Sequence, residues 1–274
     1  MKTPISTALR LACLLVLPHS VWSITVPVMY YDFLGEGAPS SLGRMVHPDF
    51  DLEPRLTPTP GLVQPQLTGL TPEFRSTGGA PLDRPQLTTA ENLASWFVPD
   101  PTYNLAIPSG LNARRNSGHL QLYYPTGFFP IDGQGLGDFR DTGHNPHFTM
   151  SFSWRSTYMA NRPNVFEFAS DDDLWVFING RLWVDLGGIR PAENAPLVLD
   201  LNADAPELGL IDHRRFSFQL FYAQRNAEQA GLVATLPIYS PPIPETAVGI
   251  PLSLLGGWAV AISVRRRLGT GVRF

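Results

Sequence analysis

The stretch SDDDLWVFINGRLWVDLGG, Ser170 to Gly188, carries the clearest fold signal in the chain. Two apolar runs flank Asn179-Gly180, and this dipeptide between apolar runs favours a type I′ turn, whose two central residues both take positive φ. Such a turn joins neighbouring antiparallel strands and fixes their register, so we expect Phe177 to lie opposite Leu182. The stretch therefore predicts a β-hairpin within an antiparallel sheet.

Period-two alternation marks two further strands. In HFTMSFSW (147–154) and FSFQLFY (216–222) every second residue is a large apolar side chain, which predicts strands with one buried face. The expected buried side chains are Phe148, Met150, Phe152 and Trp154 in the first strand and Phe216, Phe218, Leu220 and Tyr222 in the second. Because no convincing helical period occurs between 91 and 240, we predict an all-β fold, an antiparallel β-sandwich.

Three consecutive aspartates, Asp171 to Asp173, precede the first hairpin strand, although strands are depleted in Asp and neighbouring carboxylates repel each other. The hairpin register expected from the turn places Leu174 opposite Asp185. Asp185 then lies diagonal to Asp172, within roughly 7–8 Å between the backbones. A fourth carboxylate would thus approach the triple. In the alternative interpretation, the aspartates accept backbone hydrogen bonds at the start of the strand, as in Asx turns.

The first 23 residues have the pattern of a secretory signal peptide. Lys2 and Arg10 supply positive charge, LACLLVLP is an apolar core too short to span a membrane, and Val21 and Ser23 are small residues before the expected cleavage point. Cys13, the only cysteine, lies inside this segment. We therefore expect an exported protein whose mature chain has no disulfide.

The C-terminal residues combine Pro244-Glu245-Thr246, an uncharged run from Ala247 to Val264, and the cluster Arg265, Arg266 and Arg267. The run lies near the lower end of the roughly 17–25 residues of a membrane-spanning helix, and the arginines after it place that end in the cytoplasm. The tail resembles the PEP-CTERM sorting tail of exosortase-bearing Gram-negative bacteria, with Thr246 where the second proline usually stands. The resemblance implies a transient inner-membrane anchor, processing by exosortase, and delivery to the cell surface or the extracellular space. A permanent single-span anchor is the alternative.

Charge argues against nucleic acid as a partner. Residues 24–245 contain 14 basic and 24 acidic side chains, a net charge of −10. Nucleic-acid-binding domains need a basic footprint, so we expect no nucleic-acid binding.

The chain divides into four parts by composition. After the signal peptide (1–23), residues 24–90 are rich in Pro, Thr and Gly, and predict a short strand near ITVPVMYYDF followed by extended loop. The β-rich domain covers 91–240, and the sorting tail covers 241–274 with its expected span at 247–264.

Several motifs together carry a family likeness. They are SWFVPDPTYN (95–104), GFFPIDGQGLGD (127–138), HNPHFT (144–149), the hairpin stretch at 170–188, and LFYAQR (220–225). Residues 91–240 resemble the fibro-slime domain, a branch of the protective-antigen-type (PA-fourteen) β-sandwich superfamily. The chain departs from the family pattern at Arg190, where a His usually stands, and at Gln224, where a Glu usually precedes the arginine.

The resemblance implies a ligand set. In carbohydrate-binding members of the superfamily, two adjacent aspartates hold a calcium ion, and the ion holds sugar hydroxyls. Calcium takes roughly 6–8 oxygen ligands, which also relieves the repulsion between carboxylates. Asp171 and Asp172 align with that pair, and Asp173 and Asp185 are expected to complete the shell. The expected ligand contacts are Phe128 and Phe129, which lie in a Gly/Pro loop, and Arg190.

Three function classes follow. The expected one is an exported bacterial surface or matrix module that binds carbohydrate or exopolysaccharide with the help of calcium. A structural matrix protein without a small ligand is the second. A glycoside hydrolase is the third, but it needs two carboxylates roughly 5–10 Å apart across a cleft, which adjacent aspartates rarely provide. The chain also lacks a Gly-x-Ser-x-Gly motif. We therefore expect no enzyme activity.

Overall fold

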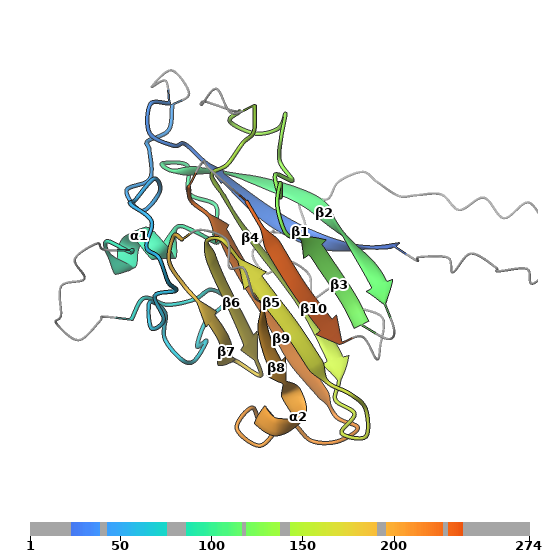
Figure 1. Cartoon of the computed structure of the whole chain (residues 1–274). Helices are drawn as coiled ribbons and strands as arrows, with labels where there is room; N and C mark the ends of the chain where they lie inside the picture. The colour runs from blue at the N-terminus through green and yellow to red at the C-terminus, as the bar shows by residue number, and fades with distance from the viewer. Residues whose placement is uncertain are drawn as a thin grey trace, which may run out of the picture.

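The computed structural model of the chain describes residues 23–38, 43–75, 86–116, 119–137, 143–190, 196–226 and 230–237 (Figure 1). Most of the predicted signal peptide and the whole predicted sorting tail, with Pro244, Glu245, Thr246 and Arg265 to Arg267, lie outside these residues. Within the described ranges, no helix has the length and apolar character that crossing a membrane requires.

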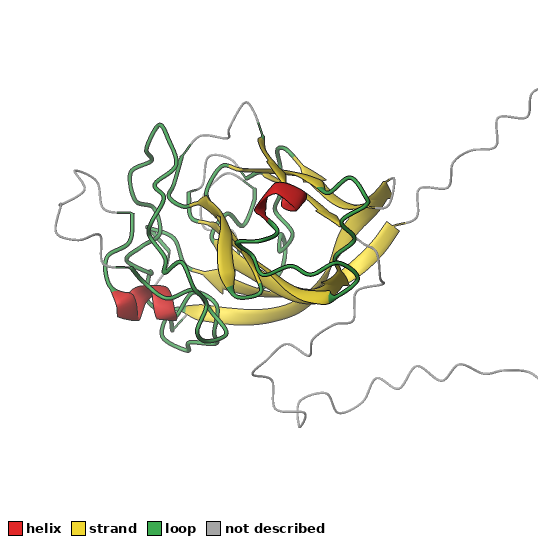
Figure 2. Ribbon diagram, turned by 90° about the horizontal axis from the view of Figure 1, so that it is seen from below, coloured by secondary structure: helices red, strands yellow, loops and turns green. Residues whose placement is uncertain are grey.

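The described residues form one antiparallel sheet of ten strands in the order β7-β6-β9-β4-β1-β2-β3-β10-β5-β8. The strands are β1 (Ser23–Phe33), β2 (Asn104–Asn116), β3 (His119–Tyr124), β4 (Phe148–Thr157), β5 (Val165–Ser170), β6 (Asp173–Ile178), β7 (Arg181–Leu186), β8 (Leu197–Asp200), β9 (Arg215–Gln224) and β10 (Leu232–Pro237). The all-β, antiparallel prediction is confirmed. The sandwich prediction needs one correction, because the two halves belong to one continuous sheet, which curls round an interior core (Figure 2).

Strand β1 makes the sheet continuous. It pairs with β2 over its whole length and with β4 from Met29 to Asp32, so it joins the two halves. The curl brings opposite ends of the sheet together, and the rings of Phe166 in β5 and Trp183 in β7 meet edge to face at 5.0 Å. The compositional boundary at residue 91 is therefore not a boundary in the fold.

The interior core is built by period-two alternation, as the sequence predicts. The apolar alternating residues of β4 and β9 all point inward, together with Phe166 and Phe168 of β5. Helix α2 (Leu201–Asp204) lies across one end of the curled sheet (Figure 2), and its Leu201 is buried in this core.

A second apolar cluster covers the outer face of β1, β6 and β9. Trp175, Phe177 and Phe221 point outward from the sheet and pack against Leu62, Val63, Phe50 and Trp96 from the N-terminal loops and the turn after helix α1 (Ala90–Ala94). The Pro-rich segment thus serves as a cover for the sheet. Burying a large aromatic side chain on this scale stabilises the fold by several kcal/mol, at about 25 cal/mol per Å² of apolar surface.

The hairpin at the centre of the sequence prediction forms, with a correction to its register. Asn179 and Gly180 have φ of 49° and 75°, as a type I′ turn requires, and Phe177 lies opposite Leu182 as expected. A β-bulge between Val176 and Phe177 then shifts the pairing by one residue. A bulge places two residues of one strand against one of the other, so every later side chain changes face.

The bulge moves Asp185 away from its expected place. Asp185 lies opposite Trp175, and Leu174 lies opposite Leu186 instead. The shift turns Val184 and Leu186 into the interior core, while Trp183, the extra residue of β7 at the bulge, packs against that core and donates from Nε1 to Asp204 Oδ2 at 2.7 Å. The observed register therefore buries two apolar side chains, Val184 and Leu186, that the expected register would have left on the other face or unpaired.

Candidate functional site

The three aspartates lie where β5 ends and β6 begins, and all are buried: Asp171 is 2% exposed, Asp172 1% and Asp173 0%. Each carboxylate finds a different set of partners, because successive residues at a strand boundary point in different directions. The cluster is therefore best described one residue at a time.

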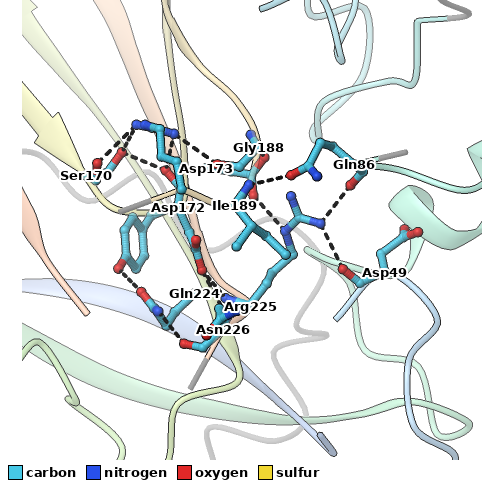
Figure 3. A network of polar contacts seen from close by, with 12 residues as sticks. Asp49, Gln86, Ser170, Asp172, Asp173, Gly188, Ile189, Gln224, Arg225 and Asn226 are labelled. Carbon is cyan, nitrogen blue, oxygen red and sulfur yellow. Dashed lines mark hydrogen bonds and ion pairs between the residues drawn. The ribbon is translucent and has the colours of Figure 1, made fainter. Parts of the chain in front are cut away.

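Asp173 pairs with a buried arginine. Its Oδ2 accepts from Arg225 Nε at 2.7 Å, and its Oδ1 accepts from the backbone N–H of Gly188 at 2.6 Å (Figure 3). Arg225 is fully buried and its Nη1 donates to the carbonyls of Asp49 and Gln86, at 2.8 and 2.7 Å. The guanidinium thus connects the strand to both ends of the N-terminal cover while it neutralises Asp173.

The aromatic cover supports the same guanidinium. The carbon at its centre lies 4.8 Å from the ring centroid of Trp96, a cation–π distance. Trp96 is itself completely buried in the outer cluster. Arg225 is therefore held by charge, by backbone carbonyls and by an aromatic face together.

Asp172 accepts hydrogen bonds from the backbone. Its Oδ2 receives the N–H groups of Arg225 at 2.6 Å and Asn226 at 3.0 Å, which fixes the chain just after β9 (Figure 3). Burial and then the charge of Asp171 raise the pKa of Asp172 well above its usual range. These bonds agree with the alternative interpretation of the aspartates as acceptors at the start of a strand.

Arg190 braces the backbone around the cluster. Its guanidinium is buried; Nη1 donates to the carbonyls of Asp172, Leu186 and Gly188, and Nη2 to the carbonyl and hydroxyl of Ser170. The prediction that Arg190 contacts a ligand is therefore corrected, because a guanidinium engaged in this way holds the turn between β5 and β6 against the turn after β7.

Asp185 does not join the triple. Its Oδ1 accepts from Trp175 Nε1 at 3.1 Å and its Oδ2 from the backbone N–H of Gly61 at 2.7 Å, on the covered outer face. Burial raises its pKa. The expected fourth calcium ligand is thus wrong in position, and the β-bulge is the physical reason.

The carboxylates do not converge as a calcium site needs. Among the described residues, no three His, Cys, Asp or Glu side chains are grouped so that they hold one metal ion. Asp172 and Asp173 are engaged by backbone N–H groups and by Arg225. This arrangement does not fit an ion shared by the three aspartates, and calcium binding stays a prediction from the sequence.

Asp171 differs from its neighbours. Its Oδ1 accepts from the backbone N–H groups of Gly231 at 3.0 Å and Asp172 at 3.1 Å, and the Tyr222 hydroxyl lies at 3.4 Å. That hydroxyl donates more closely to Gln224 Oε1, at 2.6 Å. The Oδ2 of Asp171 is buried and has no hydrogen-bond partner. Burial raises the pKa of Asp171 to about 6.

A cavity of about 290 Å³ adjoins this carboxylate, on the outer face of β3, β10 and β5, and we call it the Asp171 cavity. Its lining residues are Tyr123, Pro125, Glu167, Ala169, Ser170, Asp171, Pro196, Gly231, Leu232 and Val233. Tyr123 is 52% exposed, and strand pairing places it beside Val233, which in turn pairs with Ala169. An exposed tyrosine, an apolar row and two acidic residues therefore line one hollow.

The two phenylalanines expected to contact ligand lie elsewhere. Phe128 is 2% exposed, and its ring packs against Phe148 and Tyr222 in the interior core, so its prediction is corrected. Its backbone N–H donates to the carbonyl of Ala230, which draws the loop inward. Phe129 is half-buried and stacks on His144 at 4.2 Å. Neither lines the Asp171 cavity.

Sequence reasoning missed Tyr123 and Glu167. The signal was present in HLQLYY (119–124), where Leu120 and Leu122 point inward and leave Tyr123 on the outer face. The same alternation in β5 sends Phe166 and Phe168 into the core and leaves Glu167 outside.

Comparison with known proteins gives relatives in Dictyostelium discoideum. Protein psiD is 31% identical over 182 residues, 63% of this chain and 34% of that protein. Protein psiR is 35% identical over 148 residues, which are 50% of this chain and 14% of that protein. Protein psiI is 36% identical over 136 residues, which are 46% of this chain and 18% of that protein. The chain thus spans about a third or less of the length of these curated relatives. No protein-family model matches the chain.

Three solved structures are similar at low level. The PA14 domain of the MpAFP antifreeze protein has a TM-score of 0.27 and 10% identity, over 48% of this chain and 74% of that one. The PA14 sugar-binding domain from an RTX adhesin has a TM-score of 0.26 and 13% identity, over 47% of this chain and 76% of that one. The GH31 alpha-xylosidase from Xanthomonas citri has a TM-score of 0.27 and 14% identity, over 49% of this chain and 13% of that one. A shared fold does not follow from scores this low, so membership of the fibro-slime and PA-fourteen groups stays a prediction from sequence motifs.

Proposed function

We propose that this protein is an exported carbohydrate-binding module, and that the Asp171 cavity is its binding site. The observation that carries the proposal is one cavity lined by an exposed tyrosine, an apolar row, and two acidic residues of which Glu167 is exposed. Binding sites for small molecules combine apolar walls with a few placed polar groups in this way.

The chemistry of the cavity suits a sugar ring. A pyranose has an apolar face of C–H groups, which packs on an aromatic ring, and a rim of hydroxyls, which needs acceptors. Tyr123 offers the aromatic ring, with Val233 and Ala169 in the same row across three strands. Glu167 supplies an exposed carboxylate from β5, and Asp171 lines the cavity from the turn that follows this strand.

The size of the cavity limits the ligand. At about 290 Å³ it lies just below the roughly 300–1,000 Å³ of typical small-molecule sites. This volume suits the end or a branch of a glycan better than a long polysaccharide segment. The module would therefore attach the protein to a surface or matrix by single sugar units.

Export and anchoring belong to the same proposal. The signal-like residues 1–23 and the sorting-like tail 241–274 would place the domain outside the cytoplasm, first at the inner membrane and then at the cell surface or in exopolysaccharide. The high net negative charge of the domain fits this role better than binding to nucleic acid.

The test is a glycan array with the purified domain, read with and without a chelator. We expect binding to a defined set of glycans that Tyr123→Ala abolishes. Ile211→Ala is the control, because Ile211 is 65% exposed and lies outside the cavity. Absence of binding to any glycan, or undiminished binding by Tyr123→Ala, would contradict the proposal. Release of new reducing ends from a bound glycan would replace it with the hydrolase alternative.

A further inference from the structure

The outer face of the sheet is covered in one half and open in the other. The N-terminal loops pack on the outer face of β1, β6 and β9. On β3, β10 and β5, which lie side by side (Figure 1), the outward side chains are accessible: Tyr123 is 52% exposed, Glu167 is exposed, and Gln121 and Thr235 are half-buried. The open face therefore extends beyond the Asp171 cavity, whose lining includes neither Gln121 nor Thr235.

Strand register arranges these side chains in two rows that run across the strands. The apolar row consists of Tyr123, Val233 and Ala169. The polar row, two residues along each strand, consists of Arg114, Gln121, Thr235 and Glu167. Strand pairing places Gln121 beside both Arg114 and Thr235, and the register of β10 with β5, continued by one residue, places Thr235 beside Glu167. At about 3.4 Å per residue the two rows lie roughly 7 Å apart, so one sugar ring with its hydroxyls reaches both.

The polar row has hydrogen-bonding groups to offer a ligand. The Gln121 amide and the Thr235 hydroxyl both donate and accept, and the Glu167 carboxylate accepts. Within the part of the chain that the structure describes, no hydrogen bond engages these three side chains. The row therefore supplies the donors and acceptors that sugar hydroxyls need, in contrast to Asp172 and Asp173, whose oxygens already have partners.

The ends of the polar row set the charge and the length of a matching ligand. Arg114 and Glu167 carry opposite charges, so a uniformly anionic chain meets repulsion at one end and a uniformly cationic chain at the other. The middle of the row is uncharged. Three strand spacings of about 4.8 Å separate the two ends, roughly 14 Å in all, which is the length of about three pyranose units.

We infer that the site reads the end of a linear, uncharged oligosaccharide of about three units, which lies across the strands from β5 to β2. The inference rests on the proposed function and extends it beyond the one unit that the cavity holds. The ring faces pack on the apolar row, and the hydroxyls along one edge of the chain bond to the polar row. Gln121 and Thr235 are then specificity-determining residues.

The position of these strands favours a sugar over a peptide. An extended peptide adds to a sheet by pairing with the backbone of an edge strand. The strands β3, β10 and β5 each already pair on both sides, with β2 and β8 beyond them. The face therefore offers side chains and no free backbone edge, which suits a ligand that has many hydroxyls.

The experiment is calorimetric titration of the purified protein with linear homo-oligomers of glucose, mannose, galactose and N-acetylglucosamine, each at one, two, three and five units. For a sugar that binds, the affinity should rise roughly tenfold or more from one unit to three, as one or two further hydrogen bonds form. Between three and five units it should change by less than about twofold, because the row ends.

Variants tie this length dependence to the polar row. Gln121→Ala and Thr235→Val should each weaken binding of the three-unit chain by roughly three- to tenfold, the effect of one uncharged hydrogen bond. Thr235→Ser, which keeps the hydroxyl, should retain most of the affinity, and Gln121→Ala should leave binding of one unit unchanged. The matched control is Gln134→Ala, at an exposed position outside both rows. Melting temperatures of all variants show whether they fold.

The outcomes separate this inference from the proposed function. Equal affinity for one and three units, or undiminished three-unit binding by both row variants, would overturn the elongated site and leave carbohydrate binding in place. Tighter binding of a galacturonic acid or glucosamine trimer than of any uncharged trimer would overturn the preference for an uncharged chain. Binding of no oligosaccharide would overturn both the inference and the proposed function.

Discussion

Replacing Arg225 by methionine should destabilise the fold more than any other single change at the aspartate cluster. The variant keeps an apolar stem of similar length but leaves Asp173 buried without its counter-charge, and it removes both donors to the N-terminal cover. Breaking a buried ion pair costs about 3–5 kcal/mol, a large part of the roughly 5–15 kcal/mol that stabilises a typical domain. The cost should appear in urea unfolding followed by tryptophan fluorescence, because Trp96 lies under the guanidinium.

A double-mutant cycle separates the charge from the packing. Asp173→Asn in the Arg225→Met background should cost at least about 2 kcal/mol less than the same change in the wild type, because the carboxylate no longer has a partner to lose. The matched control is Arg114→Met on β2, at an exposed position, which should change stability by no more than about 0.5 kcal/mol. A cost below about 1 kcal/mol for Arg225→Met would refute the view that this residue pins the cover to the sheet.

Four further changes have defined outcomes. Gly180→Val should cost about 1–3 kcal/mol in thermal or urea unfolding, because φ is 75° at this position, whereas Arg181→Lys should cost little. Millimolar calcium should leave the melting temperature of chelator-treated protein unchanged. If the protein had a calcium site, calcium at a hundred times the dissociation constant would raise the melting temperature by roughly 5–10 °C, and such a rise would restore the calcium hypothesis. Since the folded pKa of Asp171 lies above its unfolded value of 3.8, its contribution to stability is full below that value and is lost as the pH rises through about 6, so Asp171→Asn should flatten the fall in stability measured between pH 4 and 6.5. In a host with exosortase, the measured mass of the mature protein should match a chain that ends near Glu245. Recovery of a chain that still ends at Phe274 would leave the permanent-anchor alternative.

Local signals in the sequence predicted much of the sheet. The Asn179-Gly180 turn, the alternation in β4 and β9, and the strand near residues 24–33 all formed as expected, because each depends on neighbours along the chain. The register beyond Phe177 did not, since the bulge turns Val184 and Leu186 into a core whose other side chains come from distant strands. No local pattern encodes such a fit.

The candidate site was predictable only in part. The place of Asp171 to Asp173 at the start of a hairpin strand was expected, but their partners lie far along the chain: Arg225 is 52 residues from Asp173, and Gly231 is 60 residues from Asp171. These partners decide which carboxylate oxygens accept hydrogen bonds and which one, Asp171 Oδ2, is buried without a partner. Phe128 was misplaced for the same reason, because the bond to Ala230 that draws its loop inward is also distant in sequence.

The position of β1 has a practical consequence for anyone who expresses this protein. A recombinant fragment that starts at residue 91, where the family-like motifs begin, would omit the strand that lies between β4 and β2. Two long inner edges would then expose unpaired N–H and C=O groups, and such edges recruit strands from other molecules. That fragment should collect in inclusion bodies, while one that begins at Ser23 should stay in solution.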